Sequence, residues 1–414
     1  MQTTPTHVIA VLGGAVSGSE AASIAAERGA LVVVIDQNER PYGKIEDGLP
    51  RWHSALRQKE YAKIDENLAH PNVLFVPSTK LGRDLDWATL TEGLGFTAVI
   101  LANGAWRDRP MPASIDAFNG RGLAYQNPFV YWFNHQLDGH YQGPRFDIPD
   151  GAIVIGGGLA SIDCVKIINF DLYGKALRAR GIDVDAETME HEGLPKILAD
   201  HNLTQAELGI QGATLYYRRR AEDMPLVSSD ADNASRAAKL EATRVKLLTK
   251  VLEKYLVHFQ GLSSPVAPIV EGDRLVGVRF QKNAQVDGKL VATDEHFDVP
   301  TKLVISSIGS IPELIPGLPA KGELYLWKDW ETGELDAAGD VHGLGNVLTG
   351  KGNIVESRKS SKKVMGNLIE QALAKPPIDD AAVRRIRAWV DARWAAVGYP
   401  GDYGAWIAAH MPSA

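Results

Sequence analysis

Short apolar runs divide the chain into strand-like segments, and the first of them is followed directly by a glycine-rich turn. The run 7–12 leads into Gly13–Gly18, an alanine-rich stretch continues to Gly29, and a second apolar run, 31–35, ends in Asp36. A strand, a tight turn, a helix and a second strand form the βαβ unit of a mononucleotide-binding fold. This order predicts a dinucleotide site at the turn.

The same order recurs near the middle of the chain. The run 152–155 leads into Gly156–Ser161 and a helix that we expect to reach about Leu172. After a long insertion, roughly 171–212, the apolar run 214–217 stops in three arginines. We therefore predict a second βαβ unit with a second dinucleotide site.

The positions of the first turn meet the requirements of pyrophosphate binding. Gly13 permits the tight turn, the small Ala15 lets the backbone approach the pyrophosphate, and Gly18 lets the helix pack against the strand. The helix N-terminus directs free N–H groups at the phosphate charge. Asp36 stands where it can accept hydrogen bonds from a ribose. A tight turn without a ligand is the alternative interpretation.

The second turn is followed by basic residues where the first is followed by an acid. Arg218 and Arg219 stand where a ribose 2′-phosphate would lie, and a guanidinium group matches phosphate geometry and stays charged. This site therefore favours NADP over NAD, although three arginines in a row are, taken alone, typical of a solvated turn. The acidic site suits FAD and the basic site suits NADPH, a pairing that implies hydride transfer between nicotinamide and flavin.

Composition narrows the chemistry further. The single cysteine, Cys164, excludes an intrachain disulfide, a thiolate metal site, an Fe–S cluster and any flavoenzyme that works through a cysteine pair. The net charge of −7 argues against a nucleic-acid partner. We find no apolar run of membrane-spanning length and no signal-peptide pattern, so we expect a cytoplasmic protein with neither a membrane anchor nor a bound metal.

These patterns predict an α/β fold with two Rossmann-like dinucleotide-binding domains of the three-layer ββα type, the NADP domain being inserted in a discontinuous FAD domain. The predicted FAD-binding domain comprises residues 1–110 and 313–414, the second part ending in a helical tail. The predicted NADP-binding domain comprises residues 111–312. Within it, we expect 107–149 to be rich in loops and 257–308 to form an antiparallel meander.

Several stretches resemble the adrenodoxin reductase and glutamate synthase small-subunit group of flavoproteins, over roughly residues 7–375. The stretches are Pro41–Pro50 with His53 three residues later, Phe129–Asn134, Tyr217–Pro225, Ser306–Gly309, Ala338–Asp340 and Thr349–Ile354. Two features depart from the group. The cysteine-rich N-terminal domain of the glutamate synthase subunit is absent, and Asn346 stands near the place of a tryptophan of adrenodoxin reductases.

The resemblance implies roles for individual residues. His53 and Asp163 would tune protons near the flavin, although a lone histidine is also typical of an ordinary surface. Asp340 would bind the ribityl or pyrophosphate part of FAD, and the helix that begins at Ile354 would aim its N–H groups at the flavin. The residues expected to bind FAD are Gly13, Ala15, Val16, Ser17, Gly18, Asp36, Gln37, Gly43, Lys44, Ile45, Leu49, Ala102, Asn103, Gly104, Gly339, Asp340, Gly350, Gly352, Asn353 and Ile354. Those expected to bind NADP are Gly156, Gly158, Leu159, Ala160, Ser161, Arg218 and Arg219.

The implied activity is that of an FAD-dependent NADPH oxidoreductase of the EC 1.18.1 class. A hydride would pass from NADPH to FAD, and single electrons would go to a ferredoxin-like protein, or the reverse. A helix predicted from Ser235 to Leu256 carries a basic stripe that could steer an acidic ferredoxin, while a solvated amphipathic face is the alternative. The stripe consists of Arg236, Lys239, Lys246, Lys250 and Lys254, opposite Leu240, Leu247, Leu248, Val251 and Tyr255. The sequence leaves monomer and homodimer open.

Two other functions stay open at this point. Phe118-Asn119-Gly120 is similar to the start of a motif of Baeyer–Villiger-type flavin monooxygenases, but the histidine and Trp-Pro that follow there are missing. The second alternative is a flavin subunit that only relays electrons inside a larger complex. In that case Trp389, Trp394 and Trp406 could form an interface, where we favour a packed terminal helix.

Overall fold

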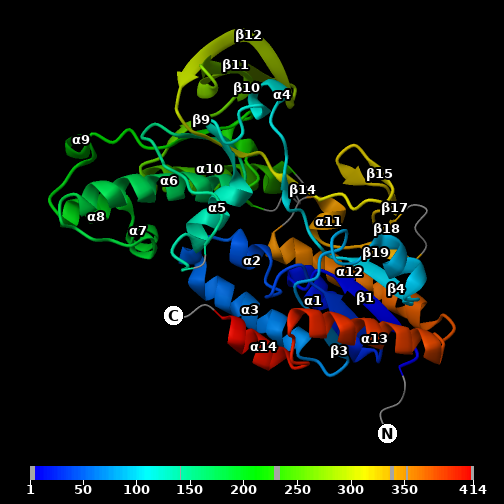
Figure 1. Ribbon diagram of the computed structural model, residues 1–414. Helices are drawn as coiled ribbons and strands as arrows, with labels where there is room; N and C mark the ends of the chain where they lie inside the picture. The colour runs from blue at the N-terminus through cyan, green and yellow to red at the C-terminus, as the bar shows by residue number, and fades with distance from the viewer. Residues whose placement is uncertain (1–4, 140, 228–233, 336–339, 351–352, 412–414) are drawn as a thin grey trace. The chain divides into compact units, whose positions relative to one another are not determined.

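A computed structural model describes residues 5–139, 141–227, 234–335, 340–350 and 353–411. The chain divides into two compact units (Figure 1). The first unit comprises Met1–Leu49, His53–Arg107 and Ser310–Ala414, and the second comprises Pro50–Trp52 and Asp108–Gly309. The second unit is thus inserted in the first along the chain, with junctions after Arg107 and Gly309 where the sequence predicts 110 and 312.

The first unit is built on a seven-stranded sheet in the order β17-β18-β19-β4-β1-β2-β3. The five strands from β19 to β3 are parallel, whereas β17 and β18 are antiparallel. All residues of β1 and β2 are buried, as expected for parallel strands covered on both faces. The strands of the sheet are β1 (Val8–Leu12), β2 (Leu31–Ile35), β3 (Val73–Val76), β4 (Ala98–Leu101), β17 (Trp327–Asp329), β18 (Glu334–Leu335) and β19 (Val341–Gly343).

Helices pack against this sheet and against one another. The helices are α1 (Val16–Glu27), α2 (Lys44–Asp47), α3 (Ser54–Leu68), α11 (Asn346–Thr349), α12 (Ile354–Leu373), α13 (Asp380–Val397) and α14 (Tyr403–His410), with the short η2 (Thr89–Gly93). The short η1 (Arg51–His53) lies at a junction, since Pro50–Trp52 belongs to the second unit. Two small hairpin strands, β15 (Ala320–Lys321) and β16 (Leu324–Tyr325), pair with each other, and β5 (Arg107–Asp108) and β14 (Ser310–Ile311) lie at the junctions. The predicted helical tail is two helices, because Gly398 ends α13 in the left-handed conformation and Pro400 follows it.

The second unit contains a five-stranded parallel sheet and a three-stranded antiparallel meander. The parallel strands are, in order, β6 (Leu123–Tyr125), β13 (Val304–Ser307), β7 (Ile153–Gly156), β8 (Thr214–Tyr216) and β9 (His258–Gln260). The meander consists of β10 (Ser263–Glu271), β11 (Arg274–Val286) and β12 (Lys289–Pro300). Along β7, Ile153 and Ile155 pack toward the meander and Val154 packs toward the helices, so the unit has three layers.

The helices of this unit correct several predicted boundaries. They are α4 (Ala113–Asp116), α5 (Gln126–His135), α6 (Leu159–Arg178), α7 (Ala186–Glu192), α8 (Leu194–Asp200), α9 (Gln205–Leu208), α10 (Ala234–Tyr255) and the short η3 (Ala221–Asp223). The region 107–149 is less loop-rich than predicted, because Phe129, Val130, Trp132 and Phe133 give α5 a buried face. The insertion folds into α7–α9. Only β10–β12 are antiparallel in the region 257–308, since β9 and β13 join the parallel sheet.

Three further observations bear on the predictions. Phe118-Asn119-Gly120 forms a turn in which the Gly120 N–H donates to the Leu123 carbonyl oxygen (2.9 Å). Cys164 is buried within α6. Among the described residues, the helices include none with the length and apolar character that crossing a membrane requires.

Candidate functional site

The first glycine turn requires glycine at two positions. Gly13 has φ +98°, and a Cβ atom there would lie 2.7 Å from the Ala102 carbonyl oxygen. A Cβ atom at Gly18 would overlap the carbonyl oxygen of Gly13. The helix α1 begins behind this turn. Its N-cap residue is Ala15, whose methyl group cannot accept a hydrogen bond, and the residues of its first turn are uncharged. The first N–H groups of α1 therefore face the turn without a side-chain acceptor, as an anion site requires.

The carboxylate of Asp36 lies against the same turn. It accepts hydrogen bonds from the N–H of Gly14 (2.7 Å) and the N–H of Asn38 (2.9 Å). Burial raises the pKa of Asp36 to about 6, while these two N–H groups lower it. The ionised form therefore predominates at pH 7. Each carboxylate oxygen keeps lone pairs beyond its backbone partner, so the group can also accept from ribose hydroxyls.

A buried polar atom without a partner lies beside the turn. Within the described part of the chain, Asn103 Oδ1 is buried and accepts no hydrogen bond. Asn103 follows β4, and its Cα atom would lie 3.0 Å from a Cβ atom at Gly13. Ala102 before it donates its N–H to Leu12, and Gly104 after it has φ +71°. An unsatisfied acceptor at this place fits a donor of a bound nucleotide.

The chain before α12 completes this site from a distant part of the sequence. Gly345 has φ +65°, and a Cβ atom there would overlap the hydroxyl of Ser17 on α1. Ser361 on α12 donates its hydroxyl to the Ser17 carbonyl oxygen (3.1 Å). Sequence reasoning missed Gly345, although Gly343 and Gly345 at the end of β19 form a glycine pair that is a signal of such a turn.

The other expected FAD residues near α12 are placed in part. Gly350 ends α11 with φ +58°. Asn353 is the N-cap of α12 and accepts from the N–H of Glu356 (3.0 Å), and Ile354 begins the helix. Gly339 and Gly352 lie outside the described residues.

Asp340 is not brought to the turn. Its carbonyl oxygen accepts from Val99 N–H, and Val341 pairs with Val99, which pairs in turn with Ala10. Asp340 therefore precedes β19, at the edge of the sheet where the parallel strands begin, whereas the glycine turn follows the edge where they end. Its carboxylate forms an ion pair with Lys375 (2.5 Å). We do not keep Asp340 in the proposed site.

The segment after β2 packs against the turn. Gly43 is the N-cap residue of α2, and a Cβ atom there would lie 3.0 Å from the Cβ atom of Ala15. Lys44 donates to the hydroxyl of Ser310 (3.1 Å) and lies 5.8 Å from the ring centre of Trp106. The remaining expected residues are Val16, Ser17 and Ile45, which are buried, and Gln37 and Leu49, which are half-buried.

The second glycine turn is also close-packed, in the second unit. A Cβ atom at Gly156 would overlap the Ser307 carbonyl oxygen, and one at Gly157 would overlap the ring of Tyr217. A Cβ atom at Gly158 meets nothing within 4 Å in the described structure. The helix α6 begins after it with Leu159, Ala160 and Ser161, and the Ser161 hydroxyl donates to the Ser307 carbonyl oxygen (3.1 Å). The N-terminus of α6 therefore has free space at Gly158, whereas the ring of Tyr217 covers it at Gly157.

The arginines after β8 differ in their surroundings. Arg218 is exposed, and its guanidinium forms no ion pair with any residue that the structure describes. Arg219 lies 3.6 Å from Asp223, and its Nε is buried without a hydrogen-bond partner in the described chain. Arg220 donates to Asp223 (3.2 Å). Of the three arginines, Arg218 is therefore best placed to bind a phosphate, while Asp223 partly neutralises the charge of Arg219.

The two predicted catalytic residues fall in different units. His53 is half-buried in the first unit and precedes α3. Asp163 lies on α6 in the second unit, 3.9 Å from the ammonium group of Lys166. Lys166 is buried, lies 3.3 Å from Glu190 and stands over the ring of Tyr255 at 4.8 Å. This cluster could not be predicted from the sequence, because Glu190 comes from the insertion. The tuning roles of His53 and Asp163 remain predictions.

Across the ranges that the structure describes, no group of three or more histidine, cysteine, aspartate or glutamate side chains is arranged to hold a metal ion.

Comparison with known proteins identifies the fold. A scan against protein-family models and a search of curated protein sequences found no match. Among solved structures, a variant of FprA from Mycobacterium tuberculosis has a TM-score of 0.72 at 19% identity over 95% of this chain and 91% of that chain. FprA in complex with NADPH has a TM-score of 0.71 at 19% identity with the same coverage. Thioredoxin reductase from T. acidophilum has a TM-score of 0.51 at 12% identity over 88% and 98% of the two chains. These likenesses confirm the predicted α/β fold with two Rossmann-like domains.

Proposed function

We propose that this protein is an FAD-dependent NADPH oxidoreductase of the adrenodoxin reductase type that passes electrons to a ferredoxin-like protein. One observation carries the proposal: two glycine turns open helices at the ends of parallel strands, with Asp36 beside one and the exposed Arg218 beyond the other. The likeness to FprA, which binds NADPH in one of the compared structures, supports this assignment of nucleotides.

The first unit fits FAD. The open start of α1 would hold the pyrophosphate, Asp36 the ribose, and the orphaned Oδ1 of Asn103 would accept a hydrogen bond. Gly345 would leave room beside Ser17. When bound, FAD supplies a carrier that takes up a hydride and releases electrons singly.

The second unit fits NADPH. The open space at Gly158 and the uncapped start of α6 suit a pyrophosphate, and Arg218 suits the 2′-phosphate.

Anaerobic reduction of the purified flavoprotein tests this function. We expect NADPH to bleach the flavin rapidly and NADH to do so weakly. Arg218→Ala should raise the dissociation constant for NADPH by about 10- to 100-fold and leave the response to NADH unchanged, because a hydrogen bond to a charged group contributes ~1.5–3 kcal/mol. Arg220→Ala is the matched control, since Arg220 is directed at Asp223. A wild-type flavin that neither nucleotide bleaches, or that both bleach equally, contradicts the proposal.

The ferredoxin partner is supported by the surface of α10. Arg236, Lys239, Lys246 and Lys250 are exposed on this helix. Lys254 is half-buried against Tyr255 (5.3 Å to the ring centre), where burial lowers its pKa, and does not belong to the exposed stripe. On the opposite face Leu248 and Tyr255 are buried, whereas Leu247 is 38% exposed.

Charge reversal on α10 tests this partner. Lys246→Glu together with Lys250→Glu should lower kcat/KM for an acidic ferredoxin by about tenfold at low salt, because favourable long-range steering becomes repulsion. The difference should fade as salt screens the charges, and flavin reduction by NADPH should not change. Lys289→Glu with Lys302→Glu, two exposed lysines elsewhere in the unit, carries the same change of charge as a control. Equal kinetics for the two double variants would remove α10 from the docking surface.

A further inference from the structure

The last helix is tied to the loop that follows β2. Trp406 on α14 donates its indole N–H to the Glu39 carbonyl oxygen (2.7 Å). In the opposite direction, the Arg40 guanidinium donates to the His410 carbonyl oxygen (2.7 Å). Figure 1 shows α14, in red, beside α3, to which Tyr403 is hydrogen-bonded. The tryptophans of the tail are therefore packed within the first unit, with the Trp406 side chain 5% exposed.

A shared acid adds a third connection. Asp65 on α3 accepts hydrogen bonds from the hydroxyl of Tyr403 on α14 (2.6 Å) and from the hydroxyl of Tyr42 in the loop (3.1 Å). Tyr42 is fully buried and stacks on Tyr61 with 3.9 Å between ring centres. The loop 37–43 is thus held at Glu39, Arg40 and Tyr42, by α14 directly and through Asp65.

The loop in turn bears on the first glycine turn. A Cβ atom at Gly14 would lie 2.8 Å from the Pro41 side chain, and a Cβ atom at Gly43 would lie 3.0 Å from the Cβ atom of Ala15. The N–H of Asn38 donates to Asp36, the acid of the candidate ribose site. The loop carries no regular secondary structure before α2, so its backbone groups depend on such external partners. A displacement of the loop would therefore reach both the turn and the Asp36 carboxylate.

We propose that α14 acts as a clasp that positions the loop 37–43 for FAD, with Trp406 as the main positioning residue. This inference rests on the proposed function only in naming FAD as the ligand. A buried indole N–H requires an acceptor, and for Trp406 that acceptor belongs to the loop beside the glycine turn. Trp394 provides the comparison within the same tail, because its indole N–H donates over the same distance (2.7 Å) to Phe75 on β3 instead.

Two variants distinguish a positioning role of Trp406 from a role in general packing. Trp406→Phe and Trp394→Phe each lose one indole hydrogen bond and keep an aromatic ring. In a titration of the apoprotein with FAD, we expect Trp406→Phe to raise the dissociation constant about fivefold to tenfold, which corresponds to one hydrogen bond. Trp394→Phe should change it less than about twofold, even where the two variants lower Tm alike.

Hydrogen exchange of the apoprotein decides the inference without FAD. Trp406→Phe should accelerate exchange of the amides in 37–43 about fivefold or more, and Trp394→Phe should leave them unchanged. Unchanged exchange in Trp406→Phe, or equal losses of FAD affinity in both variants, would overturn the clasp. A wild-type protein that binds no FAD would contradict the proposed function, while the exchange rates would still report whether α14 holds the loop.

Discussion

Alanine at Gly18 is expected to abolish tight FAD binding while the protein stays folded. The added Cβ atom overlaps the carbonyl oxygen of Gly13, which is backbone and cannot rotate away. The start of α1 must therefore shift from the turn, and its N–H groups lose their common direction. Overpacking costs ~1–3 kcal/mol even without a ligand. We expect the FAD dissociation constant to rise at least about a hundredfold, the equivalent of ~3 kcal/mol.

A second glycine provides the control for this measurement. Gly366 is exposed on α12, and a Cβ atom there meets nothing within 4 Å in the described structure. Gly366→Ala should keep full FAD affinity and add up to ~1 kcal/mol of stability, because alanine favours a helix interior. The measurement is FAD titration of each apoprotein, with circular dichroism to follow the fold. FAD bound by Gly18→Ala with wild-type affinity would show that pyrophosphate does not sit at this turn.

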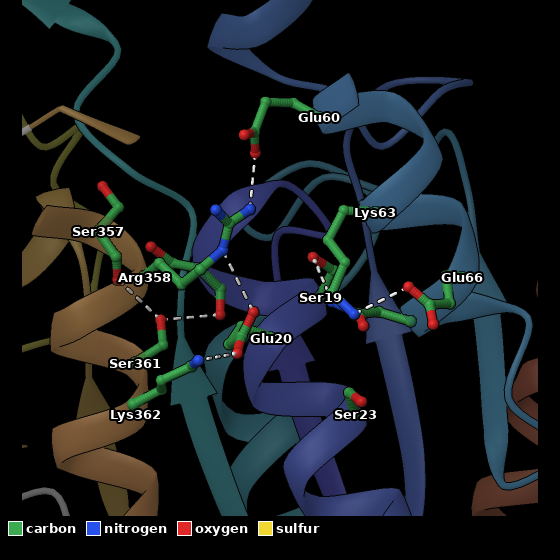
Figure 2. Close-up of polar contacts among 12 residues, drawn as sticks. Ser19, Glu20, Ser23, Glu60, Lys63, Glu66, Ser357, Arg358, Ser361 and Lys362 are labelled. Carbon is green, nitrogen blue, oxygen red and sulfur yellow. Dashed lines mark hydrogen bonds and ion pairs between the residues drawn. The ribbon is translucent and has the colours of Figure 1, made fainter. Parts of the chain in front are cut away.

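Replacing Arg358 by methionine is expected to cost the most stability. Figure 2 shows its guanidinium on α12 between two acids, Glu60 on α3 and Glu20 on α1. The nearest atoms are 2.6 Å apart for Glu60 and 3.4 Å apart for Glu20. The Glu60 side chain is only 4% exposed, so without this cation its charge stays buried. Removing one partner of a buried ion pair costs ~3–5 kcal/mol, which urea denaturation of the apoprotein measures.

Lys362 supplies the matched control for Arg358. Its ammonium group also pairs with Glu20 (3.4 Å), but its side chain is 63% exposed. Lys362→Met should cost less than ~1 kcal/mol, because water screens the pair. Adding Glu60→Gln to Arg358→Met should recover much of the loss, since the buried charge is then removed. If Arg358→Met lowers the free energy of unfolding no more than Lys362→Met does, this account of the network is contradicted.

The sequence alone determined the parts of the site that depend on neighbours along the chain. A strand, a glycine turn and a helix of this kind form within about 20 consecutive residues. Gly13, Gly18 and Asp36 were therefore predictable, and the structure places them together. The same local reasoning located the second turn at Gly156 and the arginines that end the next strand. It also predicted α10 closely, since helical periodicity is a property of consecutive residues.

Only the tertiary structure decided which distant residues meet at these turns. Asp340 lies at the side of the sheet where the parallel strands begin, and Gly345 lies at the side where they end, next to the glycine turn. The pairing of β19 with β4 decides both positions, because it sets the register of that whole segment. Asp223 shares the charge of Arg219, and Arg358 joins three helices. The tryptophans of the tail looked like an interface or a terminal helix, and contacts across more than 300 residues bring Trp406 to the loop beside the glycine turn. Such contacts follow from the packing of whole helices and strands, so they cannot be predicted from the pattern of neighbouring residues.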